Sequence, residues 1–388
     1  MSKFIINPFR FEGAVTDGDF CGRQEDIKSL LSYMHSGNNA IISMKRRVGK
    51  TSLIREIYKN HNNHGLITGY ADVYGITSVK DFYLVIKESV EEIVGMSQRL
   101  NIAVEAIAGA FGAANIQMQV GENNQFIIDY NGNNYGVLIK KLLLSLQTYA
   151  SQNNLRISFA IDEFQKIEKL VPLDTDAIET NMRTAMQDCK NVSFIILGSN
   201  QTALDSIFQE ARPLYRQGSH YTLKPIEEDV FYRWVKNKFQ LKEISISQEV
   251  FKEIYTQANT EAKIIQHICF ELFNNKDELQ EIAKSDVHKA IIDIYKGNSE
   301  ISTKFNYLKL REQKMMKVIA LETKKGASSS PLLIEYGINQ GSVNGLLKQM
   351  VKGYAITKIK TGKYEIVDTE MKLWIKVSHN QLVSNSHA

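Results

Sequence analysis

The stretch "IISMKRRVGKTSLI", residues 41–54, decides the fold because an apolar run precedes it and a Gly-Lys-Thr sequence lies within it. Residues 39–43, "NAIIS", are typical of a short strand, and residues 50–60, "KTSLIREIYKN", have apolar side chains at helical spacing. A strand, a glycine-containing loop and a helix form the context in which backbone amides at a helix N-terminus bind phosphate. The stretch therefore predicts a phosphate-binding loop.

Met44 stands where the motif G-x-x-x-x-G-K-[ST] has its first glycine. Because that glycine permits unusual backbone torsions, the site could be working, decayed or a coincidence. Gly49 and the amides up to Thr51 form the inner cradle, so a side chain at position 44 need not clash with phosphate. We expect nucleotide binding to be retained. The sequence supports hydrolysis less strongly than it supports binding.

A second strand points to the same chemistry. Residues 157–161, "ISFAI", form an apolar run suited to a strand buried on both faces, and Asp162 and Glu163 follow it. Carboxylates at the end of such a strand face the crevice where α/β sheets bind ligands. In a nucleoside triphosphatase, Asp162 would hold Mg²⁺ and Glu163 would polarise the attacking water. An ordinary strand that ends in a solvated acidic turn is the alternative.

Three further segments extend an alternation of strands and helices. They are "GLITGYADVY" at 65–74, "VSFIILGSN" at 192–200 and "HYTLKPI" at 220–226. Five strands that alternate with helical segments predict an α/β fold with a parallel sheet covered on both faces. Residues 97–135 exceed a minimal core: 99–114 predicts a helix, and the residues around "GENN" predict a hairpin. This insertion would dock a partner or be plain decoration.

The composition indicates a globular protein of two or three domains, with 43% hydrophobic and 23% charged residues among 388. Cys21, Cys189 and Cys269 have no metal-like spacing, which favours reduced thiols in a cytoplasmic protein. No apolar stretch is long enough for a signal peptide or a bilayer span, so we expect no membrane partner. From residue 303 onward, 14 basic residues face six acidic ones, a net charge of +8, whereas the whole chain carries +4. This basic end is a candidate polyanion-binding surface.

The basic end also predicts three helices, at 306–321, around Pro331 and at 338–353, and then a hairpin across "TGK". This order is typical of a winged helix-turn-helix, which would place its third helix in the major groove of DNA and its wing on phosphate. The candidate DNA contacts are Gln340, Ser342, Asn344 and Lys348 on the helix, and Lys358, Lys360 and Lys363 on the wing. Gly341 and Gly345 weaken the helix, so a winged helix that docks a protein or serves as a lid is the alternative.

Five segments, in this order, resemble the prokaryotic AAA+/STAND-type P-loop ATPases, often called archaeal-type ATPases, and are similar in layout to origin-recognition ATPases. They are "FCGRQEDIKSLL", "SMKRRVGKTSLI", "IDEFQ", "LGSN" and "RPLYRQ", followed by the basic tail. The resemblance covers nearly the whole chain. It implies an ATPase core at 1–226 with strand order five, one, four, three, two, an α-helical lid at 227–300 and a winged-helix domain at 301–388.

The resemblance also implies the roles of site residues. Gly22 and Arg23 would lie near adenine, and Lys50 would contact the β and γ phosphates. Thr51 and Asp162 would hold Mg²⁺, Glu163 would complete the Walker B pair, and Asn200 or Ser199 would be the first sensor. Arg216, with Arg212, would reach a γ-phosphate. The implied nucleotide-binding residues of the loop are Arg47, Val48, Gly49, Lys50, Thr51 and Ser52.

Several features leave alternatives open. The Gly-x-Pro that the family commonly has in its lid is replaced by "ANTEAKIIQHICFEL", where Lys263 would contact phosphate or lie solvated at a helix start. Lys45, Arg46 and Arg47 would contact phosphate or a neighbouring subunit, or form a solvated lip of the loop. We expect His220 and His267 to be packed histidines rather than catalytic ones.

Two functions remain. In the first, the chain is an ATPase and a molecular switch: ATP with Mg²⁺ closes the core against the lid, and hydrolysis promoted by Glu163 reopens it. The tail would then report the nucleotide state to double-stranded DNA, to a protein partner or through self-association. In the second, the chain is a nucleic-acid- or protein-binding module with a structural or weakly active nucleotide site. The Lys-Thr and Asp-Glu pairs favour the first function, and Met44 favours the second.

Overall fold

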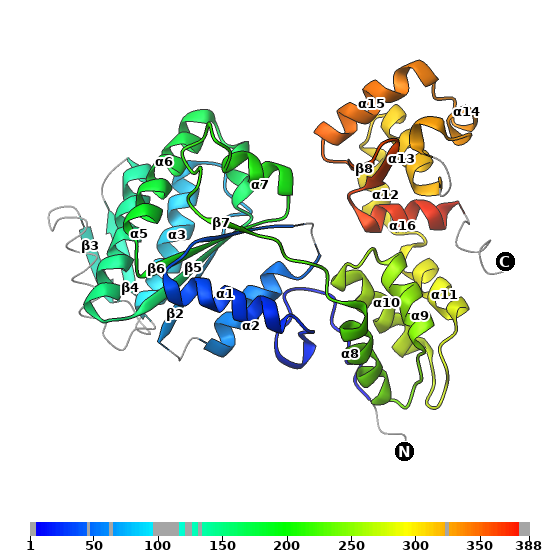
Figure 1. Ribbon diagram of the computed structural model, residues 1–388, viewed down its shortest axis with the longest axis horizontal. Helices are drawn as coiled ribbons and strands as arrows, with labels where there is room; N and C mark the ends of the chain where they lie inside the picture. The colour runs from blue at the N-terminus through cyan, green and yellow to red at the C-terminus, as the bar shows by residue number, and fades with distance from the viewer. Residues whose placement is uncertain are drawn as a thin grey trace. The chain divides into compact units, whose positions relative to one another are not determined.

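The computed structural model describes residues 5–44, 47–61, 65–95, 116–120, 126–130, 134–322 and 326–379. The chain divides into two compact units (Figure 1). We call residues 14–224 the core unit, and residues from 225 onward, together with the segment up to Gly13, the helical unit. The resemblance implies a core at 1–226, whereas residues 5–13 group with the helical unit.

A five-stranded parallel sheet forms the centre of the core unit. Its strands are β1 (Ala40–Ser43), β2 (Leu66–Asp72), β5 (Arg156–Asp162), β6 (Val192–Gly198) and β7 (Ser219–Tyr221), in the order β2-β5-β6-β1-β7. Counted along the chain, this order is five, one, four, three, two, which confirms the predicted topology. Because all strands are parallel, their carboxyl ends meet at one edge, where Asp72 pairs with Asp162 and Ser43 with Gly198.

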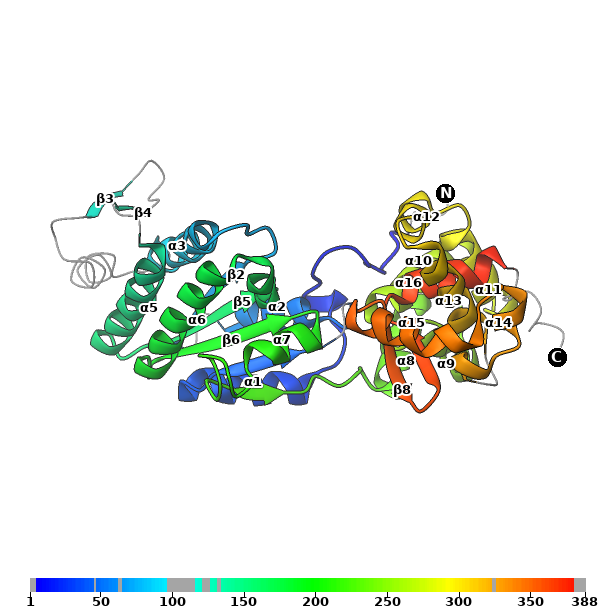
Figure 2. The ribbon, with the colours of Figure 1, turned by 90° about the horizontal axis from the view of Figure 1, so that it is seen from above.

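Helices cover both faces of the sheet (Figure 2). One face packs against α1 (Gln24–Ser36) and α2 (Lys50–His61), and the other against α3 (Val79–Gly95), α5 (Tyr135–Gln152) and α6 (Pro172–Asp188). Neighbouring residues of β1 alternate between the two cores: Ala40 and Ile42 pack toward α1 and α2, and Ile41 toward the other side. This two-sided burial explains the uninterrupted apolar runs of the strands.

Shorter elements complete the core unit. They are η1 (Asp17–Asp19), η3 (Phe164–Lys169), α7 (Gln201–Ile207), β3 (Ile116–Val120) and β4 (Phe126–Tyr130). The antiparallel pairing of β3 with β4 confirms the hairpin predicted in the insertion. The helix predicted at 99–114 lies outside the described residues.

The helical unit begins with four helices: α8 (Glu228–Gln240), α9 (Gln248–Gln257), α10 (Ala262–Asn275) and α11 (Lys284–Tyr295). The N-terminal segment packs on them through Phe9, which is 1% exposed and has ring centroids of Trp234, Phe239 and Phe273 within 6.1 Å. The Pro8 carbonyl also accepts a 2.6 Å hydrogen bond from Lys238. These contacts explain why residues 5–13 belong to the helical unit.

The end of the chain has the element order of a winged helix. It comprises α12 (Ser299–Asn306), α13 (Leu310–Leu321), η4 (Ala327–Ser329), α14 (Leu332–Glu335), α15 (Gln340–Lys352), β8 (Ile356–Lys360), β9 (Lys363–Ile366) and α16 (Thr369–Ser378). Ser330 Oγ accepts a 3.2 Å hydrogen bond from the Leu332 amide at the start of α14. The sequence reasoning missed α16, although Asp368 caps it by accepting from the amides of Glu370 and Met371.

Several smaller predictions can be compared with the structure. All three cysteines are buried free thiols, as expected. His267 is packed: its ring stacks on Phe11 with centroids 3.9 Å apart, and burial lowers its pKa to about 4. The expectation was wrong for His220, whose side chain is 52% exposed and lies 3.8 Å from Asp205. No helix within the described ranges is both long and apolar enough to cross a bilayer.

Candidate functional site

The loop after β1 does not require glycine at position 44. Among its described residues, positive φ values occur at Arg47, 67°, and Gly49, 89°, and not at Met44. The Met44 amide continues the strand ladder to the Gly198 carbonyl at 3.4 Å, and its half-buried side chain packs against the core formed with α1 and α2. Met44 therefore extends β1, and its side chain has a packing role.

Two buried cations hold the loop. Lys50, at the start of α2, donates from Nζ to the Met44 carbonyl at 2.9 Å. Arg23 donates from Nη2 to the Val48 carbonyl at 2.8 Å, and from Nη1 to the Lys224 carbonyl at 2.9 Å and to Asp26 at 3.1 Å. Burial lowers the pKa of Arg23, whose side chain is 3% exposed. The loop is thus held at its start by Lys50 and before Gly49 by Arg23.

Three other residues predicted to bind nucleotide, Gly22, Arg23 and Ser52, differ in what they contact. Gly22 and Arg23 both have positive φ, 67° and 69°, and lead directly into α1. Their predicted place near adenine stays a prediction, whereas the contact of Arg23 with the loop backbone is direct. Ser52, expected to bind nucleotide, is buried and accepts from the Val15 amide at 3.1 Å. Its hydroxyl therefore holds the segment before η1.

Asp162 collects three hydrogen bonds at the edge of the sheet. Thr51 Oγ1 and the Tyr70 hydroxyl donate to its Oδ2 at 2.7 and 2.6 Å, and the Glu163 amide donates to its Oδ1 at 2.8 Å. The structure thus brings together Thr51 and Asp162, the predicted magnesium residues. Tyr70 was not predicted. Burial and the nearby Asp162 raise the pKa of Tyr70, so its phenol stays protonated and donates.

Glu163 is held by residues that follow two different strands. Its φ of 57° is left-handed, and its Oε2 accepts from Gln165 Nε2 at 2.5 Å and from Ser199 Oγ at 2.9 Å. The sequence left the first sensor open between Ser199 and Asn200 and named Asn200 as catalytic. The structure places Ser199 on Glu163, whereas Asn200 accepts from the Ala203 amide at 3.0 Å and caps α7.

A cavity of about 540 Å³ opens over this edge of the sheet, and its lining includes Thr51, Arg55, Tyr70, Asp72, Asp162 and Glu163. Burial and the negative charges of Asp162 and Glu163 raise the pKa of Asp72. Within the described residues no group of three or more His, Cys, Asp or Glu side chains could hold a metal ion alone. Mg²⁺ commonly binds one or two carboxylates together with substrate phosphates, so the Thr51–Asp162 pair fits this ion.

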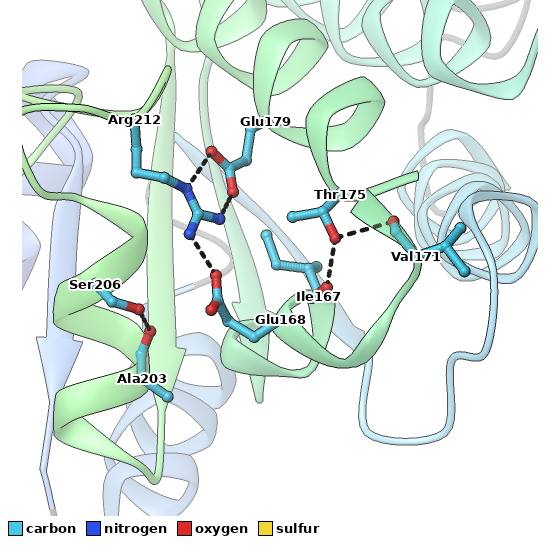
Figure 3. Close-up of polar contacts among 8 residues, drawn as sticks. All are labelled: Ile167, Glu168, Val171, Thr175, Glu179, Ala203, Ser206 and Arg212. Atoms are coloured by element: carbon cyan, nitrogen blue, oxygen red, sulfur yellow. Dashed lines mark hydrogen bonds and ion pairs between the residues drawn. The ribbon is translucent and has the colours of Figure 1, made fainter. Parts of the chain in front are cut away.

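Arg212 lies in a partly buried ion-pair network (Figure 3) and is not among the residues that line the cavity. Its Nη1 lies 2.7 Å from Glu168, and its Nε donates to Glu179 at 3.0 Å while Nη2 binds the other oxygen of Glu179. Glu179 is 1% exposed and lies on α6, and Glu168 lies in η3. Arg212 therefore contacts two carboxylates in this structure, and its contact with a γ-phosphate stays a prediction. Arg216 is exposed, with its guanidinium 4.9 Å from the Tyr215 ring, and its role stays a prediction.

The remaining cationic candidates lie in the helical unit or outside the described residues. Lys263, in the first turn of α10, is partly exposed and forms a 3.4 Å ion pair with Glu370 of α16, and its contact with phosphate stays a prediction. Lys45 and Arg46 are outside the described residues. The candidate DNA contacts are exposed, although Gln340 donates to the Ser328 carbonyl at 3.0 Å; the others are Ser342, Asn344, Lys348, Lys358, Lys360 and Lys363.

A scan against models of protein families and a search of curated proteins found no match. Among solved structures, the chain is similar to a Walker-type ATPase of Pyrococcus abyssi, with a TM-score of 0.64 and 15% identity over 95% of this chain and 99% of that one. It is also similar to the ORC2 protein of Aeropyrum pernix, described as ADPNP-ADP complexes, with a TM-score of 0.56 and 13% identity over 94% of this chain and 95% of that one. At these identities the likeness establishes the fold.

Proposed function

We propose that this chain, which has the fold of the AAA+ P-loop ATPases, binds ATP with Mg²⁺ and hydrolyses it as a molecular switch. The observation that carries the proposal is the 2.7 Å contact between Thr51, directly after Lys50, and Asp162 at the end of β5. A phosphate-binding lysine and helix N-terminus thus lie beside a carboxylate and a hydroxyl suited to Mg²⁺. The ADPNP-ADP complexes of the similar ORC2 protein support nucleotide as the ligand.

Each residue has a distinct part in the proposed reaction. The amides of Gly49 to Thr51 bind phosphate oxygens, and Lys50 exchanges the Met44 carbonyl for the β and γ phosphates. Thr51 and Asp162 would hold Mg²⁺, which when bound neutralises charge on the phosphates. Glu163 accepts a proton from the attacking water as the water oxygen bonds to the γ-phosphorus and the bond from that phosphorus to ADP breaks.

Measuring ATP affinity and ATP turnover separately tests the proposed phosphate loop and the proposed base. We expect Lys50→Ala to weaken ATP binding at least about tenfold, and Glu163→Gln to retain ATP while losing at least about 99% of turnover. The controls are Lys28→Ala and Glu88→Gln, which remove exposed charges from α1 and α3. Equal ATP affinity in Lys50→Ala would refute the phosphate loop, and normal turnover in Glu163→Gln would refute the proposed base.

We also propose that the winged helix binds double-stranded DNA, because Lys358, Lys360 and Lys363 are exposed on one hairpin in a segment of net positive charge. Each DNA phosphate that a lysine no longer neutralises should reduce the slope of log affinity against log salt by about 0.9. Changing all three lysines to Gln in the full chain should therefore reduce it by about two to three. The control changes three scattered exposed lysines, Lys28, Lys190 and Lys284. Salt-insensitive or absent DNA binding would favour a protein-docking role for this domain.

A further inference from the structure

Gln165 makes a set of contacts that the proposed roles do not use. It lies in η3, two residues after Glu163, and is 7% exposed. Its Nε2 donates to Glu163 Oε2 at 2.5 Å and to Ser199 Oγ at 3.2 Å, while Ser199 Oγ donates to the same carboxylate oxygen at 2.9 Å. Gln165 and Ser199 therefore converge on one oxygen of Glu163 and also contact each other.

The carboxylate of Glu163 fixes the direction of this amide. The other amide atom, Gln165 Oε1, is buried and has no hydrogen-bond partner among the described residues. A glutamine rotated by half a turn would bring its oxygen against the negative Oε2 of Glu163, which is repulsive. The unpaired oxygen is accommodated beside Gly198, where a Cβ atom would come within 2.6 Å of it. A buried polar atom without a hydrogen-bond partner costs free energy. The hydrogen bond from Gln165 Nε2 to Glu163 therefore offsets the cost of leaving Gln165 Oε1 unpaired.

We infer that Gln165 is a positioning residue for hydrolysis: with Ser199 it holds Oε2 of Glu163, so that Oε1 is the oxygen that receives the proton of the attacking water. The inference rests on the proposed function. Glu163 lines the cavity, and its left-handed backbone also restricts where its carboxylate can lie. A general base acts only when it is aligned with the water, so a loose carboxylate slows the chemical step without weakening ATP binding.

The test is Gln165→Met in the full chain, because methionine keeps the length of the side chain and removes the donor. We expect kcat to fall about tenfold or more, with KM and the Kd for ATP within about twofold of the wild type. In a Glu163→Gln background the same change should lower the remaining turnover by less than about twofold, because residues that act as a unit are not additive. Gln209→Met, an exposed glutamine between α7 and β7, is the control.

The outcomes separate this inference from the proposed function. An unchanged or increased kcat in Gln165→Met, or a loss confined to KM, would overturn the inference. If that variant does not fold, Ser199→Ala must show the same fall in kcat at constant ATP affinity, and an unchanged kcat there overturns the inference instead. A wild type that binds ATP without turning it over would overturn the proposed hydrolysis and the inference with it.

Discussion

The hydroxyl of Tyr70 donates a 2.6 Å hydrogen bond to Oδ2 of Asp162, the oxygen that also accepts from Thr51. Tyr70 lies on β2, next to the strand that ends in Asp162, and the guanidinium of Arg55 lies 4.3 Å from the centroid of its ring. The phenol is therefore fixed by a neighbouring strand and by α2, and it orients a carboxylate proposed to hold Mg²⁺. Partners of this kind commonly set the geometry of a metal ligand.

Tyr70→Phe should weaken Mg²⁺ binding in the presence of ATP about tenfold, because Asp162 loses a donor that fixes its direction. ATP binding measured in EDTA should stay within about twofold of the wild type, since Tyr70 is not proposed to contact phosphate. Calorimetric titration of Mg²⁺ into the ATP-bound protein measures the first quantity. Tyr307→Phe is the control, because Tyr307 is 86% exposed and lies in the helical unit. Equal Mg²⁺ affinity in the two variants would contradict the proposed role of Tyr70.

The ion pair of Arg212 with Glu179 predicts a large effect on stability. Arg212→Ala leaves the carboxylate of Glu179 buried without its cation, so the free energy of unfolding should fall by about 3 kcal/mol. Replacing both partners, Arg212→Met with Glu179→Met, should recover much of that loss because no buried charge remains. Arg216→Ala, at an exposed position, should change the free energy of unfolding by less than about 0.5 kcal/mol.

Urea unfolding followed by circular dichroism gives these free energies, and ATP turnover gives a second comparison between the two arginines. If Arg212→Ala and Arg216→Ala were equally stable, the network in Figure 3 would not contribute as described. A loss of turnover in Arg216→Ala at unchanged stability would support the predicted phosphate contact of Arg216. Unchanged turnover would remove Arg216 from the site.

The central pairs of the site could be predicted because their signals are local. Lys50 and Thr51 follow a strand within one short loop, and Asp162 and Glu163 end a single apolar run. The contact between Tyr70 and Asp162 could not be predicted, because it joins residues 92 positions apart and depends on the register of β2 against β5. The parallel sheet brings these segments together, and the sequence of one strand does not specify which strand pairs with it.

Other differences have separate physical causes. Asparagine is a favoured N-cap residue, and Asn200 directly precedes α7 in "SNQTAL". This capping signal could have identified Asn200 as the helix cap and left Ser199 as the candidate sensor. Met44 suggested a defect because the motif has glycine at that position. The loop residues with positive φ are instead Arg47 and Gly49. The segment 5–13 carries aromatic residues, but nothing local indicates that Phe9 packs on α8 and α10.

The stacking of His267 on Phe11 predicts that the stability of the helical unit depends on pH. Burial, and then the positive charge of Lys263, lowers the pKa of His267 from 6.5 to about 4, so the unfolded chain binds a proton in a range where the folded chain does not. The stability that the neutral His267 ring contributes is fully present above pH 6.5 and is lost as the pH falls toward 4. Because the ring is partly exposed, we expect a loss of about 2 kcal/mol.

His267→Phe keeps a ring beside Phe11 but cannot titrate, so its stability should fall less than that of the wild type over this range. Both tryptophans of the chain, Trp234 and Trp374, lie in the helical unit, so tryptophan fluorescence during urea unfolding follows this unit selectively. The comparison between variant and wild type cancels the titration of carboxylates common to both. His35→Gln, an exposed histidine near the end of α1, is the control. Parallel stability curves for wild type and His267→Phe would show that this ring is not the group responsible.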